Sequence, residues 1–171
     1  MKLIVKNEAT IGKEELKKML ECGGLHVGDE LEIDGALWRV LKIEGRKIMI
    51  WKHTGLNISS VFSTDGSNKY EGSDLQKAFR KMETPEELKG LITDEGFFPL
   101  SIEEIRELLP TEADRIATDE EGNTVWWWTR SCHRGYGYYA WGVYPSGAVN
   151  YLYGSSAADA SFTCAPACVI C

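Results

Sequence analysis

The stretch VWWWTRSCHRGYGYYAWGVYPSGAVNYLYGSSAADASFTCAPACVIC, which runs from Val125 to Cys171, differs sharply in composition from everything before it. It opens with three consecutive tryptophans and contains six of the seven tyrosines of the chain. From Gly135 onward its only charged side chain is Asp159. A segment so rich in aromatic and small residues predicts short strands and loops, and the charged remainder of the chain is expected to support them.

The chain as a whole has 171 residues and a formal net charge of −7. This length predicts a single domain over 1–171, in which 1–24 form an N-terminal strand and helix, 25–124 a β meander and a helical part, and 125–171 the C-terminal segment. The acidic balance argues against a nucleic-acid partner, because phosphate contacts need clustered lysine and arginine. No apolar run reaches 18 residues, so no membrane span is expected. The first residues lack the apolar core of a signal peptide, which favours a cytoplasmic location or a phage particle.

The part upstream of Val125 predicts a meander and several short helices. The turns Asp34-Gly35 and Gly45-Arg46 separate alternating apolar residues, which predicts antiparallel strands over 30–33, 36–44 and 47–51. Helix signals include an apolar stripe, an N-cap serine and two capping boxes, found at 13–22, Ser73, Thr84-Pro-Glu-Glu87 and Ser101-Ile-Glu-Glu104.

In the C-terminal segment, turn residues leave three candidate strands, over 126–130, 138–143 and 148–152. Alternation along the second strand would place Trp141 and Val143 on one face, and Gly142 and Tyr144 on the other. These patterns together predict an α+β fold with mostly antiparallel short strands and several short helices.

The five cysteines predict free thiols, because an odd number in a chain without a signal peptide does not suggest a disulfide framework. Cys168 and Cys171 have CxxC spacing but sit in an apolar run, which favours a buried or terminal strand. A zinc site built from Cys164, Cys168, Cys171 and His133 would lack the second closely spaced ligand pair that is usual for zinc. No cofactor and no metal are therefore expected.

Catalysis is not expected from the residues that usually carry it. His26, His53 and His133 are the only histidines, and none stands in a Ser-His-Asp, HExxH or nucleophile-elbow context. Cys132 and His133 are sequence neighbours, which point to opposite faces of a strand. The carboxylate triplets of calcium-dependent lectins are absent from the segment. A binding protein is therefore favoured over an enzyme.

The aromatic residues of the segment divide into expected core and expected surface. Trp126 to Trp128 and Trp141 are expected in the core, where strand aromatics are usually found. For the tyrosines, composition alone favours neither the core nor the surface, since many buried hydroxyls would need hydrogen-bond partners. Tyrosines spaced by glycine and serine have the composition of an antibody paratope, in which rigid amphipathic rings are separated by small residues.

Several motifs of the chain follow one another in an order that is similar to a known family. WWWTRS, then Ala140-Trp-Gly-Val143, Gly147 and Ala165-Pro-Ala-Cys-Val-Ile170 resemble the signature W-W-L-R-S, A-x-x-V, G and G-V-R-P-A of a bacterial and phage domain family of unknown function. Upstream matches are Val27-Gly-Asp29, Leu37 to Leu41 and Ser73-Asp-Leu75, so the likeness spans roughly 25–171. Thr129 stands where leucine is usual, and Cys164-Ala165 replaces Val-Arg, which leaves the family's arginine without a counterpart.

This resemblance implies a C-type lectin-like fold, shared with formylglycine-generating enzymes, and a relation to the variable proteins of diversity-generating retroelements. In such systems, adenines of a template repeat are copied with errors into the end of the gene. An asparagine codon mutated at its adenines can encode Tyr, Ser, Gly, Ala, Asp, Cys, Phe and others, but not Lys, Glu, Gln, Met or Trp. Residues from Gly135 to Cys164 use this restricted set, with Trp141 as the exception.

The function expected from this resemblance is recognition of an unknown protein or glycan ligand on a target surface, through a hypervariable tyrosine-rich face. The expected framework is Trp126 to Trp128, Arg130, Trp141, Val143, Gly147, Val149 and Pro166. The expected ligand-binding residues are Tyr136, Tyr138, Gly142, Tyr144, Ala148, Asn150, Tyr151, Tyr153, Ser155 and Asp159. The alternative is a non-catalytic structural module of a phage tail or surface protein without a diversified site. Self-association through the tyrosines stays open.

Overall fold

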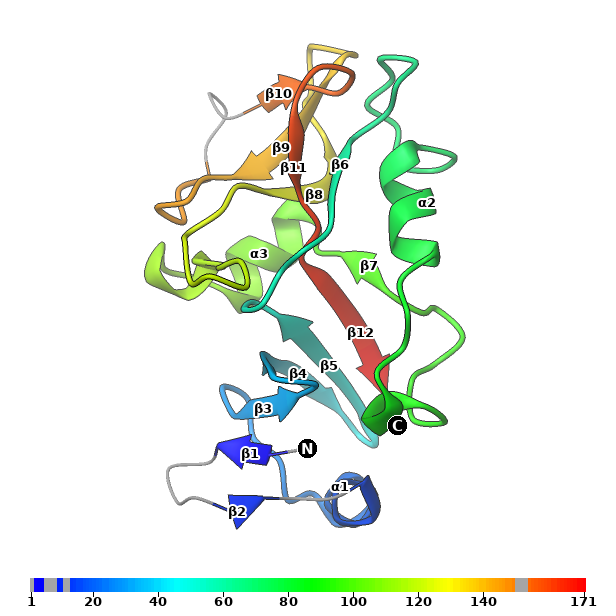
Figure 1. The fold of residues 1–171 in the computed structure, drawn as a ribbon, viewed down its shortest axis with the longest axis vertical. Helices are drawn as coiled ribbons and strands as arrows, with labels where there is room; N and C mark the ends of the chain where they lie inside the picture. Colours follow the sequence, from blue (N-terminus) through cyan, green and yellow to red (C-terminus); the bar gives the residue numbers. More distant parts are fainter. Residues whose placement is uncertain (1, 5–8, 11–12, 150–153) are drawn as a thin grey trace.

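The computed structural model describes residues 2–4, 9–10, 13–149 and 154–171, with side chains described for 13–149 and 156–171. The chain is α+β, with mostly antiparallel strands and a few short helices (Figure 1). Its strands form two sheets, and the helices are α1 (Lys13–Cys22), α2 (Asp74–Arg80) and α3 (Ile102–Leu108). None of the helices in the described ranges is long and apolar enough to cross a membrane.

The larger sheet is fully antiparallel and contains the predicted meander. Its order is β2 (Ala9–Thr10), β1 (Lys2–Ile4), β3 (Glu30–Ile33), β4 (Ala36–Glu44), β5 (Lys47–Lys52), β12 (Pro166–Ile170) and β7 (Phe98–Pro99). The three meander strands match the predicted ranges to within one residue, because the two turns fix both the ends and the pairing of the strands.

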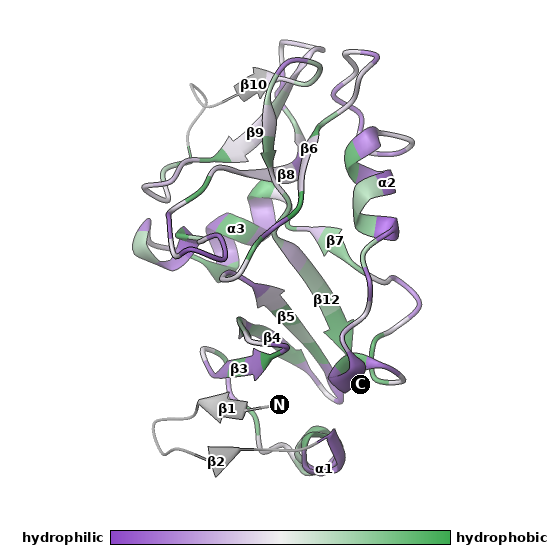
Figure 2. Cartoon of the chain, in the orientation of Figure 1, coloured by the Kyte–Doolittle hydropathy of each residue, from purple (hydrophilic) through white to green (hydrophobic). Residues whose placement is uncertain are grey.

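β12 lies inside the larger sheet, although it comes from the end of the sequence. It pairs with β5 on one side, where Cys168 faces Ile50, and with β7 on the other (Figure 1). Figure 2 shows β5 and β12 as predominantly apolar strands. Cys164 and Cys168 are buried, and burial raises the pKa of both thiols, that of Cys164 to about 12. All five cysteines are free, as predicted.

The smaller sheet is built almost entirely from the C-terminal segment. Its order is β10 (Gly154–Ser156), β9 (Tyr139–Val143), β8 (Trp127–Cys132), β11 (Ser161–Thr163) and β6 (Ser59–Val61). Neighbouring strands are antiparallel except β8 and β11, which meet in parallel at Trp127 and Thr163. Residues 125–171 therefore contribute to both sheets and connect them.

The prediction of a helix over 13–22 is confirmed by α1, and the two helices predicted to begin at a serine are confirmed as well. Ser73 caps α2 by accepting a hydrogen bond from the Gln76 amide, and Ser101 and Glu104 form the capping box of α3. The capping box predicted at Thr84 is wrong, because this segment forms only a 3-10 turn, Glu86–Leu88, without a side-chain cap. The predicted strand over 148–152 is absent from residues 148–149, and the rest of it lies outside the described residues.

The three consecutive tryptophans, Trp126 and the first two residues of β8, point alternately to the two faces of the smaller sheet. Trp127 points to one face, where its ring lies 5.2 Å from that of Trp51 and its indole N–H donates to the Arg115 carbonyl. Trp126 and Trp128 point to the other face, where both pack against the ring of Phe162. Trp127 and Trp128 are fully buried and Trp126 is half-buried, so the predicted core role holds for this motif.

Candidate ligand-binding surface

The loop that joins β8 to β9 carries the most exposed tyrosines of the described chain. We call residues 133–139 the tyrosine loop; it lies at the end of the molecule opposite α1 (Figure 1). Tyr136 is 51% exposed and Tyr138 is 53% exposed. Their rings contact each other edge to face, with centroids 6.2 Å apart, and both also pack against Tyr139. Both side chains are thus presented to solvent as predicted, on a shared aromatic base.

A buried asparagine holds the backbone of the tyrosine loop. The side-chain amide of Asn68 donates to the carbonyls of Tyr139 at 2.8 Å and Tyr136 at 3.0 Å, and it lies 3.4 Å from that of His133. The Asn68 backbone amide donates to Gly137. Because one side chain collects several carbonyls of the loop, the two exposed tyrosines stand on a fixed backbone.

The ring of His133 connects the tyrosine loop to the sheet beneath it. It stacks on Trp141 at 5.1 Å with an interplanar angle of 24°, and it also contacts Tyr136 and Tyr139. Trp141 is buried, and the guanidinium of Arg106 lies 6.0 Å from the centre of its ring. Trp141 is therefore part of the framework, as predicted, and it carries the aromatic base of the loop.

Gly142 corrects the predicted binding face. It is buried, because the ring of Phe162 covers it on the face that was expected to be open. A Cβ atom at this position would lie 2.8 Å from Cε2 of Phe162. The prediction of exposure was wrong because alternation identifies the two faces of a strand but does not show that β11 places an aromatic ring over the second one.

The remaining predicted residues do not form one continuous face. Tyr144 is half-buried against Trp126, and Ala148 accepts a hydrogen bond from the Tyr144 amide, at the opposite end of β9 from the tyrosine loop. Asp159 is exposed in the turn between β10 and β11, where it accepts a hydrogen bond from Ser156.

The turn that holds Asp159 abuts the tyrosine loop, since the Ala157 amide donates to the Tyr138 carbonyl. Ser155 lies in β10 opposite Ala140, and its side chain is outside the described part. Asn150, Tyr151 and Tyr153 also lie outside the described residues. The described geometry thus brings together the tyrosine loop and the Asp159 turn, but not Tyr144 and Ala148.

The framework residue Arg130 and its neighbour Ser131 attach the smaller sheet to α3. Arg130 donates to the Pro99 carbonyl and to Glu104, both at 2.6 Å, and Glu104 also closes the capping box of α3. The hydroxyl of Ser131 accepts from the Ile102 amide at the start of the same helix. The TRS part of the motif therefore holds a helix end in place, which agrees with the predicted framework role of Arg130.

Thr129 and Gly147 also have structural roles. The Thr129 hydroxyl is buried, donates to the Trp141 carbonyl and accepts from the Ser131 amide, next to the register shift between β8 and β9. Gly147 has a φ of 84°, and a Cβ there would lie 1.9 Å from the Glu112 carbonyl oxygen. Gly147 is thus a framework position that a larger residue cannot occupy.

A cavity of about 490 Å³ adjoins the tyrosine loop. It is lined by α3, by the end of β8 and by Trp141, and its charged lining residues are Glu103, Arg106, Arg130 and Arg134. Arg106 and Arg134 are exposed and form no ion pair with another described residue. The surface around the tyrosine loop therefore combines aromatic rings with a basic margin, although the chain is acidic overall.

The sequence did not single out Asn68 or Phe162, which shape this surface. Asn68 stands in a Ser, Asn, Gly and Asp stretch that indicated only a loop, and Phe162 stands in a strand of three residues. The sequence around Asn68 does not indicate that this side chain is buried, because its hydrogen-bond partners lie more than 60 positions away along the chain.

The described residues contain no group of three or more His, Cys, Asp or Glu side chains that could hold a metal ion. Comparison of the chain with protein-family models, curated proteins and solved structures gave no match.

Proposed function

We propose that this protein recognises a ligand through the tyrosine loop, and that the ligand is a protein or glycan on a target surface. The proposal rests on one observation: Tyr136 and Tyr138 are about half exposed while their backbone is held by Asn68. Exposed aromatic patches commonly mark interaction sites on protein surfaces.

The physical basis of the proposal is the low entropy cost of binding through such rings. Tyrosine offers a large amphipathic contact area with only two side-chain rotors to immobilise. The stacking of His133 on Trp141 and the hydrogen bonds of Asn68 order the loop before a ligand arrives. Arg106 and Arg134 add donors at the margin for polar groups of the ligand.

The proposal extends to the origin of the surface. We infer a C-type lectin-like variable protein of a diversity-generating retroelement, in which the tyrosine loop and the Asp159 turn are diversified. The motif order supports this inference, and so does the burial of Trp127, Trp128 and Gly147 at framework positions. Gly142 drops out of the diversified set, because Phe162 leaves no room for a side chain.

In this proposal the protein binds and does not catalyse. His133 is stacked between aromatic rings, and the neighbouring Cys132 is exposed. A thiolate nucleophile needs its base within hydrogen-bond reach. Cys132 and His133 form no hydrogen bond with each other in the described chain, and this supports binding rather than catalysis.

Diversification is tested on the DNA that flanks the gene. We expect a nearby reverse-transcriptase gene and a near-copy of the 3′ end with adenines at the differing positions, which should include the codons of Tyr136, Tyr138 and Asp159. Deep sequencing of this region from a growing population should show substitutions confined to those positions. If both the repeat and the reverse transcriptase are missing, the structural-module alternative replaces the retroelement part of the proposal.

Recognition is tested separately on the protein. The double variant Tyr136→Ser/Tyr138→Ser should lose binding to glycan arrays and to bacterial surfaces that the wild type labels, at unchanged thermal stability. Val27→Ser is the matched control, because Val27 is 63% exposed and lies far from the tyrosine loop in the sequence and the fold. Equal labelling by the double variant would contradict a role of the loop in recognition.

A further inference from the structure

The cavity of about 490 Å³ beside the tyrosine loop carries an excess of positive charge. Arg130 is neutralised by its ion pair with Glu104 at 2.6 Å. Arg106 and Arg134 form no ion pair with another described residue, and Glu103 is the one acidic residue among the described residues that line the cavity. Two cations therefore face one carboxylate, in a chain whose formal net charge is −7.

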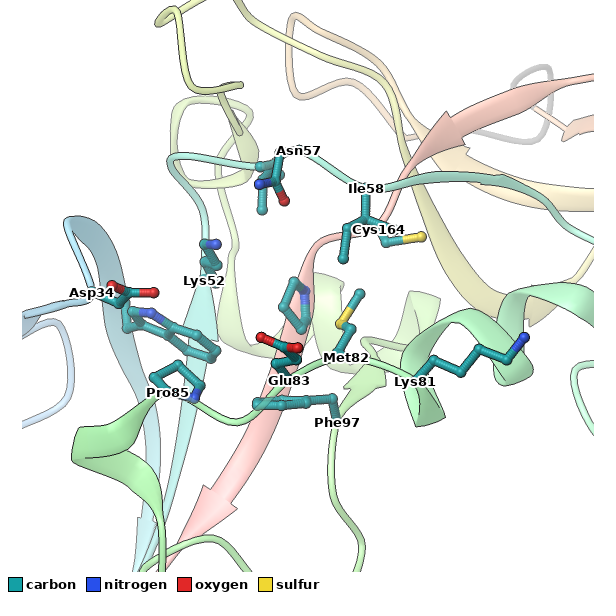
Figure 3. Close-up of a pocket in the computed structure, with 13 residues that line it drawn as sticks. Asp34, Lys52, Asn57, Ile58, Lys81, Met82, Glu83, Pro85, Phe97 and Cys164 are labelled. Carbon is teal, nitrogen blue, oxygen red and sulfur yellow. The ribbon is translucent and has the colours of Figure 1, made fainter.

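Another cavity, of about 400 Å³, has a different balance of charge. It lies between the larger sheet and the segment that follows α2, and Asp34 stands near Lys52 at its edge (Figure 3). Asp34 and Glu120 are close enough to Lys52 to act on its charge, and Glu83 adds a further carboxylate to the lining. The Lys81 side chain extends away from the space (Figure 3). This cavity therefore has no excess of positive charge for an anion.

The side chain of Arg106 is held over the ring of Trp141. Its guanidinium carbon lies 6.0 Å from the ring centre, and His133 stacks on the same indole. A guanidinium that rests on an aromatic ring uses its face, which leaves the N–H donors at its edge available. These donors match a carboxylate in shape, because the two groups can form a pair of parallel hydrogen bonds. Arg106 is thus positioned for an anion before a ligand arrives.

The cavity and the exposed tyrosines form a continuous surface. His133 and Arg134 belong to the tyrosine loop and also line the cavity. The ring centre of Tyr136 lies 5.5 Å from that of His133 and 6.2 Å from that of Tyr138. Tyrosine presents an apolar ring and a polar hydroxyl, which suit the apolar face and the hydroxyl groups of a sugar. A sugar in the cavity would place the next unit of its chain on these two rings.

The dimensions of this surface favour a sugar over a folded protein. The volume of the cavity lies within the roughly 300–1,000 Å³ that is common for small-molecule sites. Tyr136 and Tyr138 are about half exposed, so their rings offer roughly 200 Å² of contact area in total. A stable protein complex covers about 800 Å² on each partner, which is about four times that area.

We propose that the ligand is an acidic glycan. Its carboxylated or sulfated sugar would occupy the cavity beside Arg106 and Arg134, and its next sugar would cover Tyr136 and Tyr138. This inference rests on the proposed recognition function and narrows its ligand to one chemical class. Both arginines carry the same charge and line one cavity, so their attractions for an anion add, whichever of them contacts it. Glu103 opposes them, and its removal therefore provides a test of the opposite sign.

The first experiment measures binding of the wild-type protein to immobilised glycans that differ in charge. Sialyllactose, sulfolactose and lactose share one core and carry a carboxylate, a sulfate or neither. An oligogalacturonate and its methyl ester share every sugar and linkage. We expect binding to acidic members of these sets and about tenfold or more weakly to the neutral ones, since a charge-assisted contact is lost. The sialylated and sulfated arms show which anionic group is preferred, and added salt should weaken the binding.

Variants then assign the contacts on the acidic glycan that binds best. Arg106→Gln and Arg134→Gln should each weaken binding about tenfold. Glu103→Gln should strengthen it about twofold, because a repelling charge at an exposed site is removed. Arg46→Gln is the matched control, since it removes the same charge from an exposed turn between β4 and β5, outside this cavity. Thermal melting checks that each variant is folded, and Arg134 forms no side-chain hydrogen bond or ion pair with a described residue.

The inference is overturned if the protein binds no acidic glycan, or binds neutral glycans as strongly as their acidic counterparts. Binding to immobilised acidic peptides without binding to acidic glycans also overturns it, as does wild-type affinity in both arginine variants. In each case, labelling of bacterial surfaces that is lost in Tyr136→Ser/Tyr138→Ser would show that recognition by the tyrosine loop survives with another ligand. If the protein binds no glycan, peptide or surface, the proposed function fails together with the inference.

Discussion

The C-terminal segment contains two groups of aromatic rings in opposite environments. Trp126, Phe162 and Trp128 form a packed row over one face of the smaller sheet, with centroid distances of 4.9 and 4.4 Å. Tyr136 and Tyr138 also contact other rings, but they stand at the surface. The strand residues are buried by the rings that neighbour them, whereas the loop is held through its backbone and leaves two of its rings half exposed.

This contrast suggests why the loop can change without loss of the fold. The hydrogen bonds that hold the tyrosine loop end on carbonyl groups, which every residue type provides. The packed row depends instead on the shapes of particular rings. Stability and recognition would thus be assigned to different atoms of one segment.

Removal of a buried ring should have the largest effect. Trp127→Ala should lower the free energy of unfolding by about 3–5 kcal/mol, because it leaves a cavity beside Trp51 and an unpaired Arg115 carbonyl. Urea denaturation followed by circular dichroism measures this. If the alanine variant does not fold, Trp127→Phe provides a graded substitute. A loss below about 1 kcal/mol would break the contrast between the two aromatic groups.

Adding a side chain at Gly142 should have the next largest effect on stability. Gly142→Ala should destabilise the protein by about 1–3 kcal/mol, because Phe162 is held between Trp126 and Trp128 and cannot move aside freely. The control is Gly137→Ala in the tyrosine loop, where a Cβ meets no atom within 4 Å. Equal thermal stability of the two variants would show that Phe162 yields, and would return Gly142 to the variable surface.

Loss of the Asn68 side chain should loosen the tyrosine loop. Asn68→Ala removes the donor for the Tyr136 and Tyr139 carbonyls and should cost about 1–3 kcal/mol. Hydrogen exchange of the Tyr139 amide, which donates to Tyr136, should become faster. Asn57→Ala is the matched control, since this exposed amide donates to the Glu120 side chain and to no carbonyl of the tyrosine loop. Unchanged exchange in Asn68→Ala would mean that another contact orders the loop.

Low pH should destabilise the protein through Glu30, which lies in β3 of the larger sheet. Burial raises the pKa of this carboxyl, but its hydrogen bonds to His53 and Arg39 outweigh burial and lower the pKa below its ordinary value. A group with a lowered folded-state pKa stabilises the protein above its unfolded-state pKa, and the contribution is lost as the pH falls through the folded-state pKa. The stability difference between wild type and Glu30→Gln should therefore shrink below about pH 4.5. Urea titrations from pH 6 to pH 3 test this; a constant difference would contradict it.

Truncation of the exposed rings should have the smallest effect on stability. Tyr136→Ala and Tyr138→Ala should each change the unfolding free energy by no more than about 0.5 kcal/mol, since both side chains are half exposed before the change. Thermal melting of both variants beside Trp127→Ala makes the comparison direct. A loss near that of Trp127→Ala would show that the tyrosines support the fold.

Local patterns were sufficient to predict much of the secondary structure, because short-range chemistry sets it. Asp34-Gly35 and Gly45-Arg46 form the turns of the meander, and Ser73 and Ser101 begin their helices as predicted. The general tendency of strand aromatics to be buried also identified the buried tryptophans of β8, Trp127 and Trp128. Thr84 shows the limit, since the same capping pattern there precedes only a 3-10 turn.

Long-range packing decided what the patterns could not. The exposure of Tyr136 and Tyr138 followed the prediction, but the burial of Gly142 depends on Phe162, which reaches it from β11, a different strand of the sheet. The support by Asn68 depends on partners about 70 positions away. Contacts of this kind leave no periodic mark in the sequence.

The interior position of β12 has a consequence for synthesis on the ribosome. Until residues 166–170 emerge from the exit tunnel, β5 and β7 lack the strand that joins them, and the apolar edge of β5 stays unpaired. The larger sheet therefore closes only after residues 125–165 have been translated. Under the proposed diversification, each new variant would be exposed to chaperones and proteases until β12 is made, and a sequence change that blocks closure would be removed before the protein reaches any target.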